Sequence, residues 1–315
     1  TNNEPMNYKK LPTKLKTLCL LTAIALVSVA CSVNDASQPD EAELYISIPD
    51  AQFEQRLIDQ GIDSEGALDQ QLLKTDAEAI THLDLNWSGG EDEIRDITGI
   101  EGFVNLTTLT AVQQALEQID LSFNTRLDTL YLTGNILQEI DLSNNAQLVD
   151  VNLGTNELSS VEGLSGLNRL KSLDLSWNYL EEFSISNTSV EILFLNLNEL
   201  ETLDISESSN LKSLVVTSNQ LTEISLDANT ALEIVVMSDN SIQSVDLSQN
   251  PELQYFYASS NALTSLDLSS NSKLIDLRVD RNPGLTCIKI QPGQEIPTVV
   301  ISDGQELRNE CVPKF

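Results

Sequence analysis

The residues that could perform chemistry are few, because the chain has a single histidine, His82. Asp84 and Ser88 follow it closely, and these three residue types could form a nucleophile with its base. On a strand, however, His82 and Asp84 would point to the same open face, where nothing excludes water, and the sequence has no Gly-x-Ser-x-Gly turn. One imidazole also leaves little scope for zinc chemistry. We therefore predict that the protein is not an enzyme and that it has no catalytic residue, metal or cofactor.

Carboxylates dominate the charge, since 48 Asp and Glu against 17 Lys and Arg give a formal net charge of −31. Phosphate binding needs clustered cations, so we exclude a nucleic-acid partner, and the folded body should not adhere to anionic lipid. Pairs of carboxylates are too common here to indicate a glycosidase. Asp63, Glu65 and Asp69 faintly resemble a calcium loop, but without the ligand spacing and closing Glu of an EF-hand. This favours an acidic turn, with calcium binding at 63–69 left open.

Residues 1–30 have the order of a secretory signal peptide. Met6 is the expected start, four lysines lie between positions 9 and 16, and the apolar run Leu18–Val29 precedes small residues. A helix needs about 20 apolar residues to cross a membrane, and this run is clearly shorter. We therefore expect cleavage and not a permanent span.

The sequence VSVAC at 27–31 resembles the lipoprotein box of bacteria, with Ser28 where Leu is usual. The resemblance implies that Cys31 becomes the first mature residue and carries lipid, and that Ser32 after it favours the outer membrane. We therefore expect an exported protein, lipid-anchored to the bacterial outer membrane at the cell surface, that touches the membrane only through its lipid. Ordinary secretion with cleavage after Ala30 is the alternative.

Residues 31–45 are polar and acidic, which is typical of a tether between a lipid and a folded body. We assign residues 46–79 to an N-terminal cap. Asp50 is the expected N-cap of a short helix that ends at Gly61. The apolar face of this helix comprises Phe53, Leu57 and Ile58.

A repeat of 21 residues occupies positions 80–286, and we count about ten units. Each complete unit contains the pattern LxxLxLxxN, as in Leu127–Asn135, and then a second copy of the leucine pattern, as in Leu137–Ser143. Alternating apolar residues predict a short strand with one face inward, and each unit completes its core only against its neighbours. The asparagines that end the pattern recur at intervals of about one repeat: Asn135, Asn156, Asn178, Asn198, Asn219, Asn240, Asn261 and Asn282.

This repeat resembles the leucine-rich repeat family, and its doubled form looks like the short, 21-residue class found in surface proteins of the Bacteroidetes. The resemblance implies a β-rich solenoid with few helices, in which short parallel strands line a concave face. The asparagines would then be structural. Each should bury its amide and bond to loop backbone of its own and the next unit, because an unpaired buried amide costs about 1–3 kcal/mol.

The regular repeat breaks after Asn282, and we assign residues 287–315 to a C-terminal cap. Cys287 opens this segment, and Cys311 lies near its end. In an exported protein, two cysteines so placed are most simply a disulfide that closes the last turn. We expect neither of them to bind a metal.

The outward positions of the strands define the face that a partner could reach. An apolar zone crosses four consecutive strands and comprises Ile192, Phe194, Leu197, Val215, Ile234, Val236, Tyr255 and Tyr257, with Trp177 beside it. Asp150, Asn152 and Asp174 make a polar zone next to it. With strands about 4.8 Å apart, the apolar zone would be roughly 14 Å wide, which is enough for a partner site. The alternative is that Val, Ile and Tyr simply suit exposed strand positions.

We therefore predict a cell-envelope lipoprotein that binds another macromolecule, most simply a protein, through its concave face. A glycan is the alternative ligand, because Trp87, Tyr131 and Trp177 could stack on sugars. Tyr255 and Tyr257, however, have mostly aliphatic neighbours, which favours protein. A structural or adhesive spacer without a ligand is the third interpretation, since this kind of scaffold does not by itself fix a function.

Overall fold

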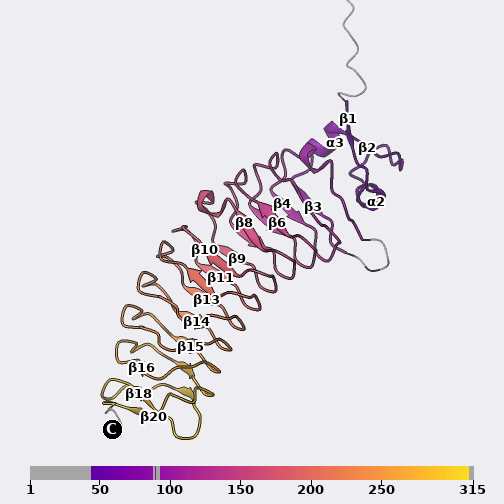
Figure 1. The fold of residues 1–315 in the computed structure, drawn as a ribbon. Coiled ribbons are helices and arrows are strands. Elements are labelled where there is room, and N and C mark those ends of the chain that lie inside the picture. Colours follow the sequence, from indigo (N-terminus) through magenta and orange to yellow (C-terminus); the bar gives the residue numbers. More distant parts are fainter. Residues whose placement is uncertain (1–43, 88, 90–92, 312–315) are drawn as a thin grey trace, which may run out of the picture. The chain divides into compact units, whose positions relative to one another are not determined.

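The computed structural model describes residues 44–311 except 88 and 90–92 (Figure 1). This part of the chain is a parallel β-solenoid of about ten turns with few helices, and a disulfide lies near its C-terminal end. The expected fold class is thereby confirmed. The predicted signal peptide, Cys31 and most of the tether lie outside the described residues.

One parallel sheet runs along the solenoid in the described chain, and we call it the main sheet. Its strands, in chain order, are β3 (His82–Asp84), β4 (Thr108–Thr110), β5 (Thr129–Tyr131), β7 (Asp150–Asn152), β9 (Ser172–Asp174), β11 (Ile192–Phe194), β13 (Ser213–Val215), β14 (Ile234–Val236), β15 (Tyr255–Tyr257), β17 (Asp276–Arg278) and β19 (Thr298–Val300). Successive strands pair directly. From β3 to β17 the middle residue of each strand is at most 1% exposed, so the two flanking residues point outward. The L-x-L pattern thus places one face of the sheet in the core.

The second leucine pattern forms a separate, interrupted row of short strands, which we call the far side. There β6 (Glu139–Asp141) pairs with β8 (Ser160–Glu162), β10 (Glu182–Ser184) pairs with β12 (Thr202–Asp204), and β18 (Cys287–Lys289) lies between β16 (Leu266–Asp267) and β20 (Glu306–Arg308). Ile140, Phe183 and Leu266 are buried and belong to the same core as the main-sheet leucines. Ile119 and Leu203, at equivalent places, pack against that core while only partly buried.

Units of different length still keep the main sheet in register. The pairs Asp150–Ser172 and Ser172–Ile192 join neighbouring strands, although the first pair is further apart along the chain than the second. In the longer unit, the 3₁₀-helix η2 (Leu164–Gly166) follows Gly163, whose φ is 84°. A Cβ there would lie 2.3 Å from the backbone nitrogen of Ser143, so only glycine fits this close approach. The length difference is therefore absorbed away from the main sheet.

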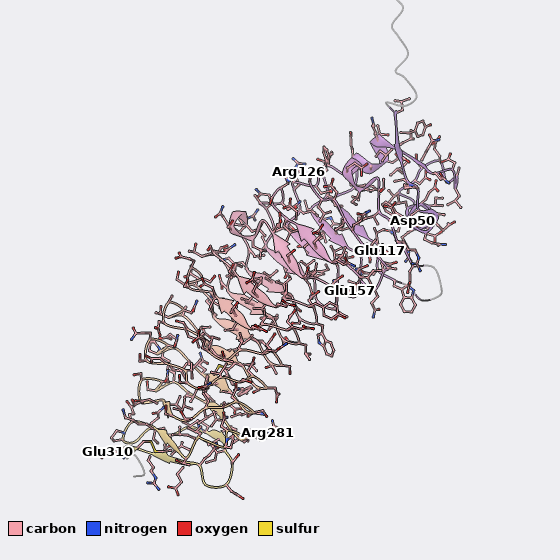
Figure 2. The ribbon with its side chains drawn as sticks, viewed as in Figure 1. Asp50, Glu117, Arg126, Glu157, Arg281 and Glu310 are labelled. Carbon is pink, nitrogen blue, oxygen red and sulfur yellow. A yellow bond between two sulfur atoms is a disulfide. The ribbon has the colours of Figure 1, made fainter. Side chains whose placement is uncertain are left out.

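The N-terminal cap combines β1 (Tyr45–Ser47), paired antiparallel with β2 (Gln71–Leu73), with the helices α2 (Ala51–Asp59) and α3 (Lys74–Glu78). Asp50, labelled in Figure 2, accepts hydrogen bonds from two backbone N–H groups at the start of α2 through its Oδ1. The guanidinium of Arg56 donates to the carbonyl of Asn86 at 3.0 Å, and the amide of Gln60 donates to the carbonyl of Asp84 at 2.7 Å. Helix α2 therefore satisfies backbone acceptors beside β3, at the start of the main sheet.

The regularly spaced asparagines hold adjacent turns together. Asn156 donates from Nδ2 to the carbonyls of Leu153 (2.9 Å), in its own turn, and Leu132 (3.0 Å), in the preceding turn. Its Oδ1 accepts from the backbone nitrogen of Leu137 at 3.2 Å, also in the preceding turn. The same pattern recurs along the ladder. The neighbour contacted is thus the preceding unit, and the expectation that it would be the next unit is wrong.

A second ladder of buried polar residues lies beyond the second leucine pattern, and the sequence reasoning missed it. Its members are Asn124, Asn145, Asn187, Ser208, Asn229, Asn250 and Asn271, all buried. Asn250, for example, donates to the carbonyls of Leu226 at 3.0 Å and Asn229 at 2.9 Å. The signal was present in the pattern Asp-Leu-Ser-x-Asn, which ends at four of these residues. The far side is therefore also tied together through side-chain amides.

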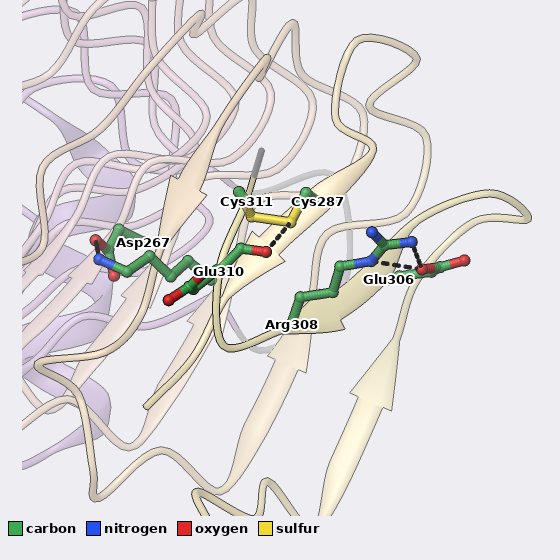
Figure 3. Close-up of a disulfide and its surroundings, with 7 residues drawn as sticks. Asp267, Cys287, Glu306, Arg308, Glu310 and Cys311 are labelled. Carbon is green, nitrogen blue, oxygen red and sulfur yellow. Dashed lines mark hydrogen bonds and ion pairs between the residues drawn. A yellow bond between two sulfur atoms is a disulfide. The ribbon is translucent and has the colours of Figure 1, made fainter. Parts of the chain in front are cut away.

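The C-terminal end is closed by the expected disulfide between Cys287 and Cys311, whose Cα atoms lie 5.8 Å apart (Figure 3). Cys287 opens β18, and the carbonyl of Glu310 lies 3.9 Å from its Sγ. Lys289, also on β18, forms an ion pair of 2.7 Å with Asp267 on β16. The bridge thus ties the chain that follows β20 to the turn before it.

Candidate functional site

The apolar zone lies on the outward face of β11, β13, β14 and β15, which are consecutive in the main sheet. The register rows across these strands are Phe194, Val215, Val236, Tyr257 and Ile192, Ser213, Ile234, Tyr255. The first row is apolar or aromatic throughout, whereas Ser213 interrupts the second. The structure therefore brings the predicted strand residues together on one continuous surface.

The side chains of this zone differ in how much they are exposed. Ile192 and Leu197 are each 36% exposed, and Trp177 is 57% exposed. The remaining members are half-buried against one another. Large apolar side chains gathered in contact on an open sheet face are the usual mark of an interaction surface in a soluble body. Leu197 and Trp177 form its most accessible edge.

Trp177 and Leu197 occupy the loop position directly before a ladder asparagine, and both have left-handed backbone, with φ of 58° and 59°. Glycine fits this position best, as Gly134 does in an earlier turn with φ of 77°. The loop backbone holds the conformation: the nitrogen of Trp177 donates to the carbonyl of Asn196 at 2.9 Å. Most other turns hold a polar residue with the same backbone at this position, such as Thr155, Ser218 and Asp239. A large apolar residue here, twice in succession, is not explained by strand propensity, because the position lies outside the strand.

Tyr257 is anchored at the border of the zone. Its hydroxyl donates to Asp276 at 3.1 Å, and the guanidinium of Arg278 lies 4.7 Å from the ring centre. Arg278 in turn donates two hydrogen bonds to Asp276, of 3.1 and 3.0 Å. Burial, followed by the hydrogen bond to Asp276, raises the pKa of Tyr257. One part of this ring is therefore covered by the protein itself.

A charged clamp flanks the zone where the strands begin. Glu191, just before β11, accepts from Lys171 and Lys212, each at 2.7 Å. The hydrogen bond from Lys171, followed by that from Lys212, lowers the pKa of the Glu191 carboxyl to about 2. The clamp spans three successive turns, and its carboxylate is charged at neutral pH. It fixes the flank of the zone beside Ile192.

The polar zone has internal partners. Tyr131 donates to Asp150 at 2.5 Å, and this bond is the main reason that its pKa rises to about 12. The Oδ1 of Asn152 accepts from the hydroxyl of Thr133 at 2.7 Å and from a loop nitrogen at 3.0 Å. Beside Tyr131, a carboxylate oxygen of Asp150 and the Oδ1 of Asn152 are thus already hydrogen-bonded within the sheet. In both tyrosine pairs Asp lies 19 residues after Tyr, a spacing that the sequence reasoning did not use.

The remaining sequence candidates are His82, Asp84 and Ser88 and the acidic turn at 63–69. His82 and Asp84 flank the buried middle residue of β3, both exposed, and the Nδ1 of His82 lies 2.9 Å from the hydroxyl of Thr81. Ser88 lies outside the described residues. In the acidic turn, Asp63 accepts from two backbone nitrogens of its own loop. Within the described part of the chain, no group of three or more His, Cys, Asp or Glu is placed to hold a metal ion.

Comparison with models of known protein families and with curated protein sequences finds no match. Solved structures do match. YopM, a leucine-rich effector protein from Yersinia pestis, aligns with a TM-score of 0.59 at 20% identity over 79% of this chain and 65% of that one. Internalin C2 from Listeria monocytogenes gives 0.54 at 20% identity, over 73% and 95% of the two chains. The functional domain of InlJ from the same organism gives 0.51 at 20% identity, over 84% and 72%.

These similarities define the class of protein: the chain has the leucine-rich repeat fold. At such low identity they show the fold alone and carry no partner from one protein to another. In this fold, the strands of the main sheet form one continuous outward face along the solenoid. Among the described residues, no helix has the length and apolar character needed to cross a bilayer.

Proposed function

We propose that the protein is a lipid-anchored protein of the bacterial cell envelope that binds a protein partner through the apolar zone. The observation that carries this proposal is the unbroken row from Phe194 to Tyr257, which leaves aromatic and aliphatic side chains open on a rigid sheet. Solvent-exposed apolar groups of this size are stabilised when a partner removes them from water.

A protein fits this surface better than a glycan. Sugar sites combine an aromatic platform with polar side chains that are free to bond hydroxyls, yet the polar groups around Tyr131 and Tyr257 bond to their own neighbours. Val215 and Val236, which lie next to each other at the centre of the zone, are aliphatic and offer a sugar no polar contact. A partner with complementary apolar side chains would use the whole zone, whereas a sugar would contact only its edges.

Site-specific photo-crosslinking in cells tests the proposal. A photo-reactive amino acid at position 194 should yield a covalent adduct with another protein, which mass spectrometry identifies. The matched control places it at Thr202, an exposed residue of the far-side strand β12 in the same turn. Adducts of equal yield at both positions, or none at 194, would contradict the proposal. A glycan-array signal that disappears in Trp177→Ala would instead support the sugar-binding alternative.

The anchor is proposed from the sequence at 27–31. Cys31→Ser should move the protein from the membrane fraction to the soluble fraction, because one lipidated residue provides the attachment. Metabolic labelling with a fatty-acid analogue should mark the unaltered protein and not the variant. A Cys31→Ser protein that still sediments with membranes would contradict the lipid anchor without affecting the proposal for the apolar zone.

A further inference from the structure

A recess of about 700 Å³ lies on the far side, away from the apolar zone. It is bounded by the segment 96–101, by residues 118–123 and by the strands β6 and β8. Six carboxylates line it: Asp96, Glu101, Asp120, Glu139, Asp141 and Glu162. The described residues that line this recess include no Lys or Arg.

The recess also has an apolar floor. Ile97 and Ile100 are 2% exposed, and Ile140 is 4% exposed, so these residues belong to the solenoid core. Phe123 also lines the recess, and its side chain is 60% exposed. A large aromatic ring in that position contributes little to the core, while its face can hold a cation. The recess therefore combines negative charge with apolar and aromatic surface.

The strand register places two like charges side by side in the recess, whereas at one other place on the far side the chain provides the counter-charge itself. Asp267 on β16 faces Lys289 on β18, and the two form an ion pair of 2.7 Å. The equivalent neighbours in the recess are Asp141 on β6 and Glu162 on β8, which are two like charges. Like charges directly opposite each other destabilise a sheet. A positively charged group of another molecule could provide the counter-charge that the residues lining the recess do not provide.

Four of these carboxylates are held in place by their own loops: Asp96 accepts from Thr98, Glu101 accepts from Gly99, and Asp120 and Asp141 do the same with serines. Asp120 accepts from the backbone nitrogen of Ser122 at 2.9 Å, and Asp141 accepts from that of Ser143 at 2.8 Å. Hydrogen bonds from these serines lower the pKa of both carboxyls, so both are charged at neutral pH. Each has a second oxygen with which to receive a ligand.

We propose that this recess binds a Lys- or Arg-containing segment of a partner polypeptide. The charged heads would reach the carboxylate rim, while the methylene stems and neighbouring apolar residues would cover Phe123 and the partly buried Ile119. No three of the described carboxylates are grouped to coordinate one metal ion, and a metal ion would leave the ring of Phe123 in water. The recess is separate from the apolar zone, so this inference does not depend on the proposed function.

A short synthetic peptide of alternating Lys and Leu is the probe, and fluorescence anisotropy measures its binding in about 0.15 M salt, which screens distant charges. The recess variant Glu139→Gln, Asp141→Asn, Glu162→Gln should weaken binding about tenfold, since it removes three exposed charge contacts. Asp141→Asn keeps the acceptor for Ser143. The control neutralises three exposed far-side carboxylates elsewhere, Glu181, Glu201 and Glu223, and should change binding by less than about twofold.

Two further variants distinguish a built site from general attraction to an acidic protein. Glu162→Lys should abolish binding, because it supplies the cation that β18 supplies to Asp267. Phe123→Ser should weaken the Lys/Leu peptide while leaving a Lys/Ser peptide of equal charge unchanged. Equal effects of the recess and control variants, or the absence of measurable binding, would overturn the proposal. The proposal would also be overturned if calcium or spermine bound to the protein in a one-to-one complex and thereby displaced the peptide. The recess would then be a site for small cations.

Discussion

Alanine substitutions at Leu193 and Phe194 separate the core of the solenoid from its exposed face. Leu193 is the inaccessible middle residue of β11, and its register partners Leu173 and Leu214 are inaccessible as well. Leu193→Ala removes three buried carbons, worth about 2.5 kcal/mol of transfer free energy. Stacked turns on both sides limit the collapse of the cavity, which adds about 1–2 kcal/mol. We expect the free energy of unfolding to fall by about 3–4 kcal/mol.

Phe194→Ala should behave differently although it changes more atoms. The ring is half-buried on the outward face, next to Val215 in the register row. Its removal loses cross-strand contact and some strand preference, together less than about 1 kcal/mol. The same change should weaken binding of the partner protein to the apolar zone, because large side chains at the centre of an interface commonly contribute about 2 kcal/mol or more to the binding free energy.

Urea denaturation followed by tryptophan fluorescence measures both variants. Trp177 lies in the loop after β9, and its backbone nitrogen bonds to Asn196 in the turn that contains β11, so it reports unfolding near the substitutions. A Trp87→Phe background makes it the sole tryptophan. If Phe194→Ala shifts the midpoint as far as Leu193→Ala, the inward and outward faces are misassigned. If Phe194→Ala changes neither stability nor partner capture, the apolar zone reflects strand preference alone.

Removal of the disulfide by Cys287→Ser should destabilise the C-terminal cap by about 3 kcal/mol in the chain-entropy model, and limited proteolysis should then cut first near Cys311. Asn250→Ala should cost about 2–4 kcal/mol in chemical denaturation, because two carbonyls in the core lose their donor; a cost below about 1 kcal/mol would contradict the structural role of the second ladder. Acid titration should reveal the clamp at Glu191. Its folded-state pKa of about 2 lies below its usual 4.5, so its contribution to stability is present above the usual value and is lost as pH falls toward 2. In Glu191→Gln that part of the acid dependence should disappear, whereas an unchanged profile would show that Lys171 does not hold the carboxylate in solution.

The sequence was sufficient to predict the solenoid because its evidence is repeated many times. A leucine that must be buried at a fixed spacing, as at Leu130 and Leu173, specifies both the inward face of a strand and its neighbours in the stack. The apolar zone followed from the same alternation, because residues on either side of a buried leucine must face out. The borders of the apolar zone could not be predicted from this alternation. The exposure of the Tyr257 ring depends on contacts with Asp276 and Arg278 in the next turn, and the repeat pattern does not specify these contacts.

The far-side recess could not be predicted for a different reason. Its wall at 96–101 belongs to the segment between β3 and β4, which is longer than the regular repeat although the two strands are neighbours in the sheet. The length of the repeat does not indicate where this longer segment packs. The second ladder, by contrast, could have been predicted from the sequence. Asn145 and Asn250 each end an Asp-Leu-Ser-x-Asn pattern, and an amide at a regularly recurring buried position needs hydrogen-bond partners.

The main sheet keeps its register across units of different length, and this gives the molecule a fixed pitch. Each added turn would lengthen the outward face by about 4.8 Å without altering the neighbours of the turns already present. Because length differences are taken up beside η2 and its equivalents, a duplicated or deleted unit need not disturb the strands on either side. The length of the outward face could therefore change in whole steps by gene duplication, while its chemistry changes one side chain at a time.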